Sequence, residues 1–408
     1  NSFSQAPNIF MEKIKPISSF SLNTYAANYI EHADFNNDGN MDIILRSNKW
    51  YLYQGNGNGT FTKKDSISYT LYANIKIKDL TNDGLPDIVF DNAYSINLGN
   101  FSFSTPLIFI SSSLPTFSDV YDFNNDGYND IAAVQQNTVL NISLNNQIGG
   151  FNAPITTTIT GAPSFNPLDL KVTDFDKDGM KDIVLCGAPN IGYLKRTGQT
   201  SFNPFVAVCT ASASKVKLAD FNNDGYEDMI MSSYSTKDFI YFMSNGTSFT
   251  KNTFSLRNNL YNSSGAASIV ALAELNGDGF IDVITHNGTT NQGSMEFAMV
   301  RNNGNGTFGI MGVYKGFDEG ALIDAFDTNN DLQPDVILCQ TNNPFYNVNV
   351  CKNYGNANLN FPKSYAYGNF AAENVLIDDF DNDLDNEAIL LSQYFGICRP
   401  FIIDDNNA

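Results

Sequence analysis

The stretch Asp122-Phe123-Asn124-Asn125-Asp126-Gly127-Tyr128-Asn129-Asp130, followed by the apolar run Ile131-Ala132-Ala133-Val134, decides the fold. It carries oxygen-bearing side chains at its first, third, fifth and ninth positions and a glycine at its sixth. Related stretches begin at Asp34, Asp79, Asp174, Asp220, Glu274, Asp327 and Asp379, so the pattern occurs eight times, at intervals of 43 to 54 residues. A repeat of this length is typical of the four-stranded blades of a propeller.

A second landmark recurs in phase with the first. Some 24 to 34 residues after the start of an acidic stretch, a phenylalanine is expected to open a further strand, at Phe61, Phe103, Phe151, Phe202, Phe249, Phe308 and Phe361. Several of these follow an Asn-Gly turn, the strongest short signal for a hairpin. The stretch at Asp379 has no such phenylalanine after it, whereas Phe10 begins a similar run near the N-terminus.

The repeats predict an all-β fold: an eight-bladed β-propeller of four-stranded antiparallel blades, formed by residues 1–408 as one domain. The segment at about residues 9–17 is expected to supply the outer strand of the last blade, which closes the ring and removes exposed sheet edges. A seven-bladed ring with one degenerate unit is the alternative.

The acidic stretches have the composition of calcium loops. Calcium binds six to eight oxygen atoms from carboxylates, amides and backbone carbonyls, and the glycine allows the left-handed turn around the ion. Without a cation, three or four carboxylates in one loop would repel one another. Eight structural Ca²⁺ ions would add sixteen positive charges to the formal charge of −20 and leave about −4. The alternative is a set of Asx-turns that hold no ion.

The predicted calcium ligands stand at positions one, three, five, seven and nine, the seventh contributing its backbone carbonyl. They are Asp34, Asn36, Asp38, Asn40, Asp42; Asp79, Thr81, Asp83, Leu85, Asp87; Asp122, Asn124, Asp126, Tyr128, Asp130; Asp174, Asp176, Asp178, Met180, Asp182; Asp220, Asn222, Asp224, Tyr226, Asp228; Glu274, Asn276, Asp278, Phe280, Asp282; Asp327, Asn329, Asp331, Gln333, Asp335; and Asp379, Asp381, Asp383, Asp385, Glu387.

The last two loops have Leu332 and Leu384 in place of the glycine. A leucine at positive φ costs about 1 kcal/mol or more, so these loops are expected to adopt another turn and to bind calcium more weakly. The additional carboxylates of the last loop would compensate there.

The stretches from Asp122 to Val134 and from Asp174 to Leu185 resemble FG-GAP (VCBS) repeats, the blades of integrin α-subunit propellers. Similar repeats occur in secreted bacterial and fungal propellers, including lectins and polysaccharide lyases. The resemblance extends over about residues 9–405 and implies structural calcium between the first and second strands of each blade, with ligands on the opposite face. Integrin propellers have seven blades, so eight would be a departure.

Composition restricts the partners and the compartment. The formal charge of −20 argues against nucleic acid, and no apolar stretch is long enough to span a membrane. Weak calcium loops fill where calcium is millimolar, so we expect a secreted or cell-surface protein. Of the five cysteines, Cys339 and Cys351 fall on neighbouring expected strands and could form a disulfide. The alternative is that all five are small buried hydrophobic residues.

The longest expected loops on the face opposite the calcium loops belong to blades six and seven. They offer amides, hydroxyls and aromatic rings suited to sugars or peptides: Arg257, Tyr261, His286, Asn291, Gln292, Asn343, Phe345 and Tyr346. The sequence has no Gly-x-Ser-x-Gly elbow, phosphate loop or His-rich zinc motif, so an enzyme is not favoured. We expect a recognition or adhesion module for carbohydrate or an extracellular protein; a polysaccharide lyase and a structural module of a larger surface protein are the alternatives.

Overall fold

A computed structural model gives the fold of the chain. It describes residues 29–69, 75–111, 116–135, 139–160, 166–199, 201–211, 213, 216–232, 238–256, 267–287, 295–317, 322–327, 332–339, 347–359, 363–366, 372–382, 386–392 and 402–403. No helix long and apolar enough to cross a membrane occurs in this part of the chain.

The described strands form seven four-stranded sheets and one three-stranded sheet, all antiparallel and each made of strands consecutive in sequence. The sheets are, in order, β1 (Tyr29–Ala33), β2 (Asp42–Arg46), β3 (Trp50–Gly55), β4 (Phe61–Ile67); β5 (Lys76–Lys78), β6 (Asp87–Val89), β7 (Ala93–Ser95), β8 (Leu107–Ile108); β9 (Thr116–Tyr121), β10 (Asp130–Gln135), β11 (Val139–Ser143), β12 (Ile155–Thr158); β13 (Asn166–Thr173), β14 (Asp182–Ala188), β15 (Asn190–Leu194), β16 (Val206–Thr210); β17 (Val216–Ala219), β18 (Asp228–Ser232), β19 (Asp238–Ser244), β20 (Phe249–Ser255); β21 (Ala267–Ala273), β22 (Asp282–Asn287), β23 (Met295–Asn302), β24 (Phe308–Phe317); β25 (Leu322–Phe326), β26 (Asp335–Cys339), β27 (Asn347–Cys351), β28 (Lys363–Ala366); and β29 (Ala372–Asp378), β30 (Glu387–Ser392), β31 (Ile402–Ile403).

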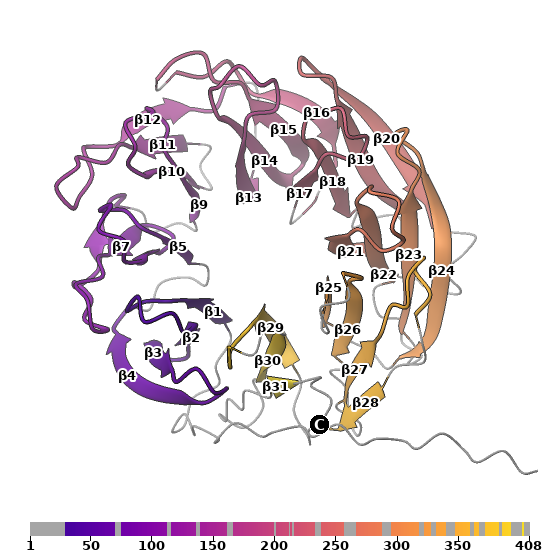
Figure 1. Cartoon of the computed structure of the whole chain (residues 1–408). Coiled ribbons are helices and arrows are strands. Elements are labelled where there is room, and N and C mark those ends of the chain that lie inside the picture. Colours follow the sequence, from indigo (N-terminus) through magenta and orange to yellow (C-terminus); the bar gives the residue numbers. More distant parts are fainter. Residues whose placement is uncertain are drawn as a thin grey trace, which may run out of the picture.

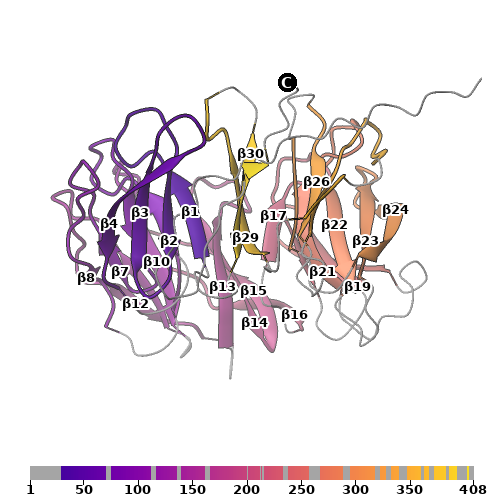
Figure 2. The same ribbon diagram turned by 90° about the horizontal axis from the view of Figure 1, so that it is seen from below.

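The sheets follow one another around a ring, with the first strand of each sheet nearest the centre (Figure 1). Seen from the side, they stand next to one another around a common axis (Figure 2). This arrangement confirms the predicted propeller of antiparallel blades. Residues 9–17, the expected closing strand, lie outside the described residues.

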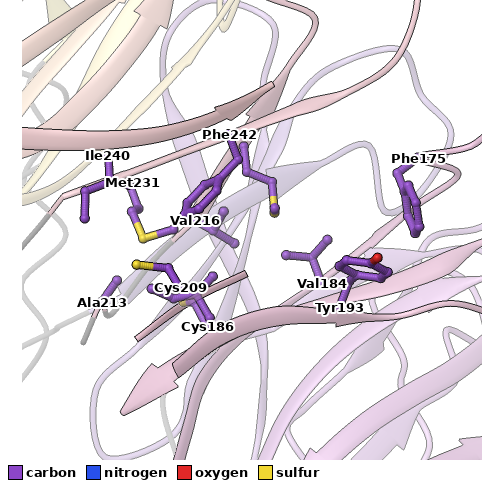
Figure 3. Close-up of a cluster of buried hydrophobic side chains, with 12 residues drawn as sticks. Phe175, Val184, Cys186, Tyr193, Cys209, Ala213, Val216, Met231, Ile240 and Phe242 are labelled. Atoms are coloured by element: carbon purple, nitrogen blue, oxygen red, sulfur yellow. The ribbon is translucent and has the colours of Figure 1, made fainter. Parts of the chain in front are cut away.

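The core is divided among the joints between neighbouring sheets. The second strands are almost wholly apolar, as in Ile131 to Val134, because both of their faces are covered by adjacent sheets. One such joint packs Val184 and Cys186 of β14 against Met231 of β18 (Figure 3), and Met229 of β18 belongs to the same buried cluster. Burial of these faces against one another holds consecutive sheets together.

The last sheet packs against the first in the same manner. Phe380 lies 5.9 Å from Phe61 between ring centroids, and both belong to one buried cluster. The His32 Nε2 atom lies 2.9 Å from Asp378 Oδ2, and this contact lowers the pKa of the Asp378 carboxyl. The first and last described sheets therefore make a joint of the same kind as those between sheets that follow one another in the chain.

Three of the predicted phenylalanines open strands, and three do not. Phe61, Phe249 and Phe308 begin β4, β20 and β24. Phe103, Phe151 and Phe202 instead form isolated bridges to Asn97, Asn145 and Arg196, and β8, β12 and β16 start four residues later. In the seventh sheet Leu359 makes the bridge, to Asn353, and Phe361 lies outside the described residues. The bridge position can therefore be occupied by a large apolar side chain that is either aromatic or aliphatic.

The possible disulfide between Cys339 and Cys351 is wrong. The register places Cys351 opposite Val336 and Cys339 opposite Val348, so the two cysteines are not opposite each other. Cys351 is a free, buried thiol, as are Cys186 and Cys209.

Candidate metal centres and the geometry of the acidic loops

Each acidic loop joins the first strand of its sheet to the second, as expected. The loop that starts at Asp34, for example, connects β1 to β2, and the one at Asp122 connects β9 to β10. The acidic loops therefore lie on one face of the ring, because the first strands run side by side around its centre.

The first residue of each loop organises the turn. One oxygen of its carboxylate accepts the backbone N–H of the sixth residue at 2.6–3.1 Å in the loops at Asp34, Asp79, Asp122, Asp174, Asp220 and Asp327. The fifth-position carboxylate accepts the N–H of the seventh residue at 2.8–3.0 Å, as in the bond from Tyr128 to Asp126. These bonds fold the first and fifth side chains back over the loop.

Left-handed backbone occurs at the fourth and sixth positions. In the loop at Asp122, Asn125 has φ 57° and Gly127 has φ 86°. Leu332 has φ 67°, and its N–H donates to Asp327 Oδ2 at 2.6 Å. The expectation of another turn at Leu332 is therefore wrong: the loop keeps the common turn, and the leucine takes the strained conformation. Leu384 lies outside the described residues.

The ninth aspartate ties its loop to the rest of the sheet. Asp130 has no exposed surface, and its two oxygens accept the N–H groups of Phe123 at 2.8 Å and Asn145 at 2.7 Å. The loops at Asp34, Asp79, Asp220 and Glu274 repeat both bonds. Burial raises the pKa to about 7 for Asp42, Asp182 and Asp228 and to about 6 for Asp87, Asp130 and Asp282. That this aspartate also binds calcium remains a prediction.

Three carboxylates converge in the loop at Asp174. Ligand oxygens of Asp174, Asp176 and Asp182 all lie within 4.8 Å of one another. Asp174 Oδ1 and Asp182 Oδ2 are buried and accept no hydrogen bond. Buried carboxylate oxygens without donors are costly unless a cation neutralises them, so this residue set is suited to a hard divalent cation.

A lysine already lies beside this cluster. The Lys195 ammonium contacts Asp176 and lies 3.5 Å from Asp178 Oδ2, and its hydrogen bond to Asp176 raises the pKa of Lys195. In the loop at Asp34, Gln54 takes the equivalent place and donates to Asp38 Oδ2 at 2.7 Å. Both side chains precede the residue whose N–H binds the ninth aspartate.

The seventh and eighth loops are described only in part. Asn329, Asp331, Asp383 and Asp385 lie outside the described residues. Asp327 and Asp335 accept the same backbone N–H bonds as their counterparts, and Gln333 lies between them. Asp379 and Asp381 follow β29, and Glu387 begins β30.

Of the predicted ligand-face residues, only His286 lies in the described part of the chain. It stands on β22, in register with Ser268 on one side and Phe297 on the other. Arg257, Tyr261, Asn291, Gln292, Asn343, Phe345 and Tyr346 lie outside the described residues, so their role remains a prediction.

Sequence reasoning missed a charged position on the first strands. Three residues before the acidic loop, six of the eight repeats have a charged residue: Glu31, Lys76, Asp119, Lys171, Lys217 and Asp324. Lys76, Lys171 and Lys217 line a cavity of ≈ 640 Å³. Aligning the repeats on their first acidic residue would have revealed this recurring charge.

The ring of antiparallel sheets and the repeated acidic loops define a β-propeller built from one recurring unit. The FG-GAP-like repeat family matches residues 17–90, 122–185 and 220–285, which amount to half of the chain. The chain therefore belongs to the FG-GAP-like repeat family.

Solved propellers share the fold at low sequence identity. A lectin from Agrocybe aegerita that recognises non-reducing terminal N-acetylglucosamine is 19% identical, with a TM-score of 0.53, and the match covers 74% of this chain and 83% of the lectin. The BP39L lectin from Burkholderia pseudomallei is 15% identical, with a TM-score of 0.52 and coverage of 84% and 100%. Sqt1 from Saccharomyces cerevisiae is 9% identical, with a TM-score of 0.65 and coverage of 97% and 100%. No protein of curated function matches the sequence.

Proposed function

We propose that this protein is a calcium-stabilised recognition module whose acidic loops hold structural Ca²⁺ and whose opposite face binds carbohydrate. The observation that carries the calcium assignment is the loop at Asp174, where two buried carboxylate oxygens have no donor and three carboxylates converge. Ion binding there would neutralise charges that otherwise repel one another.

Side chains of the first, third, fifth and ninth positions would hold the ion, together with the backbone carbonyl of the seventh. In the Asp174 loop the side chains are Asp174, Asp176, Asp178 and Asp182, and Lys195 would have to leave the cluster for a divalent ion to bind. In the loop at Asp122 they are Asp122, Asn124, Asp126 and Asp130. Calcium in such loops supplies positive charge that cross-links the turn and takes no part in chemistry.

The complete ring is proposed to have eight blades in one domain, with residues 9–17 as the outer strand of the last. The joint between the last and first sheets supports this, since Asn382 Nδ2 donates to Asn40 Oδ1 at 2.7 Å across it. Such loops fill reliably at millimolar calcium, and we therefore place the protein outside the cell or on its surface.

Carbohydrate recognition is supported by two lectins among the similar folds, although the fold alone hosts many functions. The proposed face is the one opposite the acidic loops, where the long loops of the sixth and seventh sheets begin. An extracellular protein ligand, a polysaccharide lyase activity and a purely structural role are the competing outcomes of the test.

Two measurements test the two halves of the proposal. The melting temperature should rise in millimolar calcium and fall in EDTA, because an ion bound to the folded state stabilises it by mass action. Asp174→Ala should reduce this calcium effect, and Asp65→Ala, on the exposed outer strand β4, should leave it intact. An unchanged melting temperature in EDTA would contradict the calcium assignment.

A glycan array in calcium, repeated in EDTA, tests recognition. Binding to a defined glycan supports the lectin-like function, and cleavage of an acidic polymer on incubation would identify a lyase instead. A blank array from folded protein would contradict carbohydrate recognition.

A further inference from the structure

The centre of the ring holds a cavity of ≈ 640 Å³ that no acidic loop contributes to. Its wall is built from the first strands of six consecutive sheets, β1, β5, β9, β13, β17 and β21, which surround the centre in Figure 1. Asp91 adds to the wall from the connection between β6 and β7, at the opposite end of its sheet from the acidic loop. The cavity therefore extends towards the face away from the loops.

Three lysines from three different sheets line this cavity. They are Lys76 of β5, Lys171 of β13 and Lys217 of β17. Lys171 and Lys76 both oppose the rise in the pKa of Asp169 that burial causes, although β5 and β13 belong to sheets separated by a third. Lys76 and Lys171 thus act on the same carboxylate from two sides of the cavity.

The cavity wall has two carboxylates, Asp169 and Asp91. The first is hydrogen-bonded to neighbouring backbone, and the second is only partly ionised at neutral pH. Asp169 accepts the N–H groups of Leu170 at 3.0 Å and Val216 at 3.3 Å, and it lies 4.0 Å from Lys171 Nζ. It therefore joins β13 to β17. Burial raises the pKa of Asp91 to about 7, so its negative charge is incomplete at neutral pH. The residues that line the cavity thus carry three ammonium groups against two carboxylates, inside a protein of formal charge −20.

We propose that the axial cavity is a binding site for a small organic carboxylate. Lysine ammonium groups act as point charges for such an anion, while Phe117, Leu168 and Leu272 offer apolar surface to its carbon skeleton. A polymer of phosphates is disfavoured, because the acidic exterior repels it. The site is distinct from the acidic loops and from the outer loops proposed to bind carbohydrate.

An acidic sugar and an aliphatic acid both present this carboxylate. Titration calorimetry with galacturonate, hexanoate and galactose, in carboxylate-free buffer, separates the two sources from neutral-sugar binding. We expect at least one acid to bind, with affinity that falls as salt increases, and galactose not to bind. Binding of galacturonate alone identifies an acidic sugar, and binding of hexanoate alone or of both acids identifies charge and apolar contact as the basis.

Lysine variants localise the binding. Lys76→Met and Lys171→Met should each weaken the acid about tenfold, because a hydrogen bond to a charged group contributes about 1.5 kcal/mol or more. Lys251→Met, on the exposed outer strand β20, should bind as the wild type does. Melting temperatures verify that the variants fold. Absence of acid binding to the wild type, equal binding of galactose, or unchanged affinity in both cavity variants would overturn the proposal, whatever the result with EDTA or the glycan array.

Discussion

At the scale of single residues, Leu332 is the clearest departure from the repeat. It has φ 67° where six of the other loops have glycine, and 86% of its surface is exposed, so no packing compensates for the strain. The turn is kept because the Asp327 carboxylate binds the Leu332 N–H at 2.6 Å. This hydrogen bond holds Leu332 at a positive φ that leucine otherwise avoids.

Replacing this leucine should therefore stabilise the protein. Leu332→Gly should raise the free energy of unfolding by roughly 0.5–1 kcal/mol. The substitution relieves the backbone strain of the folded state, and the greater conformational entropy of glycine in the unfolded chain offsets part of that gain. Urea denaturation in constant calcium measures it. Gly127→Ala is the converse control: a Cβ there meets nothing within 4 Å, so its expected loss of about 1 kcal/mol reflects backbone strain alone. A destabilised Leu332→Gly protein would contradict this account.

Asp91 should make stability depend on pH. Burial raises its pKa to about 7, against the opposing charge of Arg46, and its carboxylate also contributes to the raised pKa values of Tyr29 and Tyr69. The pKa of an aspartate in the unfolded chain is near 3.9, so between about pH 4 and 7 the folded state binds more protons than the unfolded state. The free energy of unfolding therefore falls as the pH rises through that window.

Asp91→Asn should remove this loss. The variant should gain stability relative to the wild type as pH rises from about 4 to 8, measured by urea denaturation at each pH. Asp65→Asn on the exposed face of β4 is the matched control and should run parallel to the wild type. A gap between Asp91→Asn and the wild type that does not change with pH would show that Asp91 is charged throughout.

At the scale of elements, an asparagine at or just after the end of the third strand fastens four of the sheets to the preceding one. Asn145 donates its N–H to Asp130 at 2.7 Å, and its amide donates to the Leu80 carbonyl of the previous loop at 2.7 Å. Asn97, Asn302 and Asn353 make the same pair of bonds. Each links an acidic loop to the next sheet through buried hydrogen bonds.

Removing one such amide should cost more than an ordinary surface change. Asn145→Ala leaves the buried carbonyls of Leu80 and Asn129 without this donor, and we expect a loss of about 2 kcal/mol in unfolding free energy. Asn152→Ala, at an exposed position after Phe151, should change stability by less than about 0.5 kcal/mol. Equal effects of the two substitutions would exclude a specific contribution from the inter-sheet bond.

At the scale of the whole molecule, the sequence predicted what is local and repeated. The acidic loops, their glycines and the apolar second strands are short patterns with a fixed physical cause, so their places could be predicted. Contacts such as Asn145 to Leu80 join residues 65 positions apart and leave no local pattern. The axial cavity was missed for a different reason: an alignment of the repeats shows the recurring charge, but Lys76, Lys171 and Lys217 line one cavity only when the sheets form a ring.

The joint between the last and first sheets has a consequence for covalent continuity. Phe380 and Phe61 meet there as Phe221 and Phe308 meet between two sheets that follow one another in the chain. Side-chain packing of the same kind therefore holds neighbouring sheets together at both joints. A chain severed once between β4 and β5 would keep its two pieces assembled as one particle, and the order in which the sheets are strung along the chain could be permuted around the circle without loss of the fold.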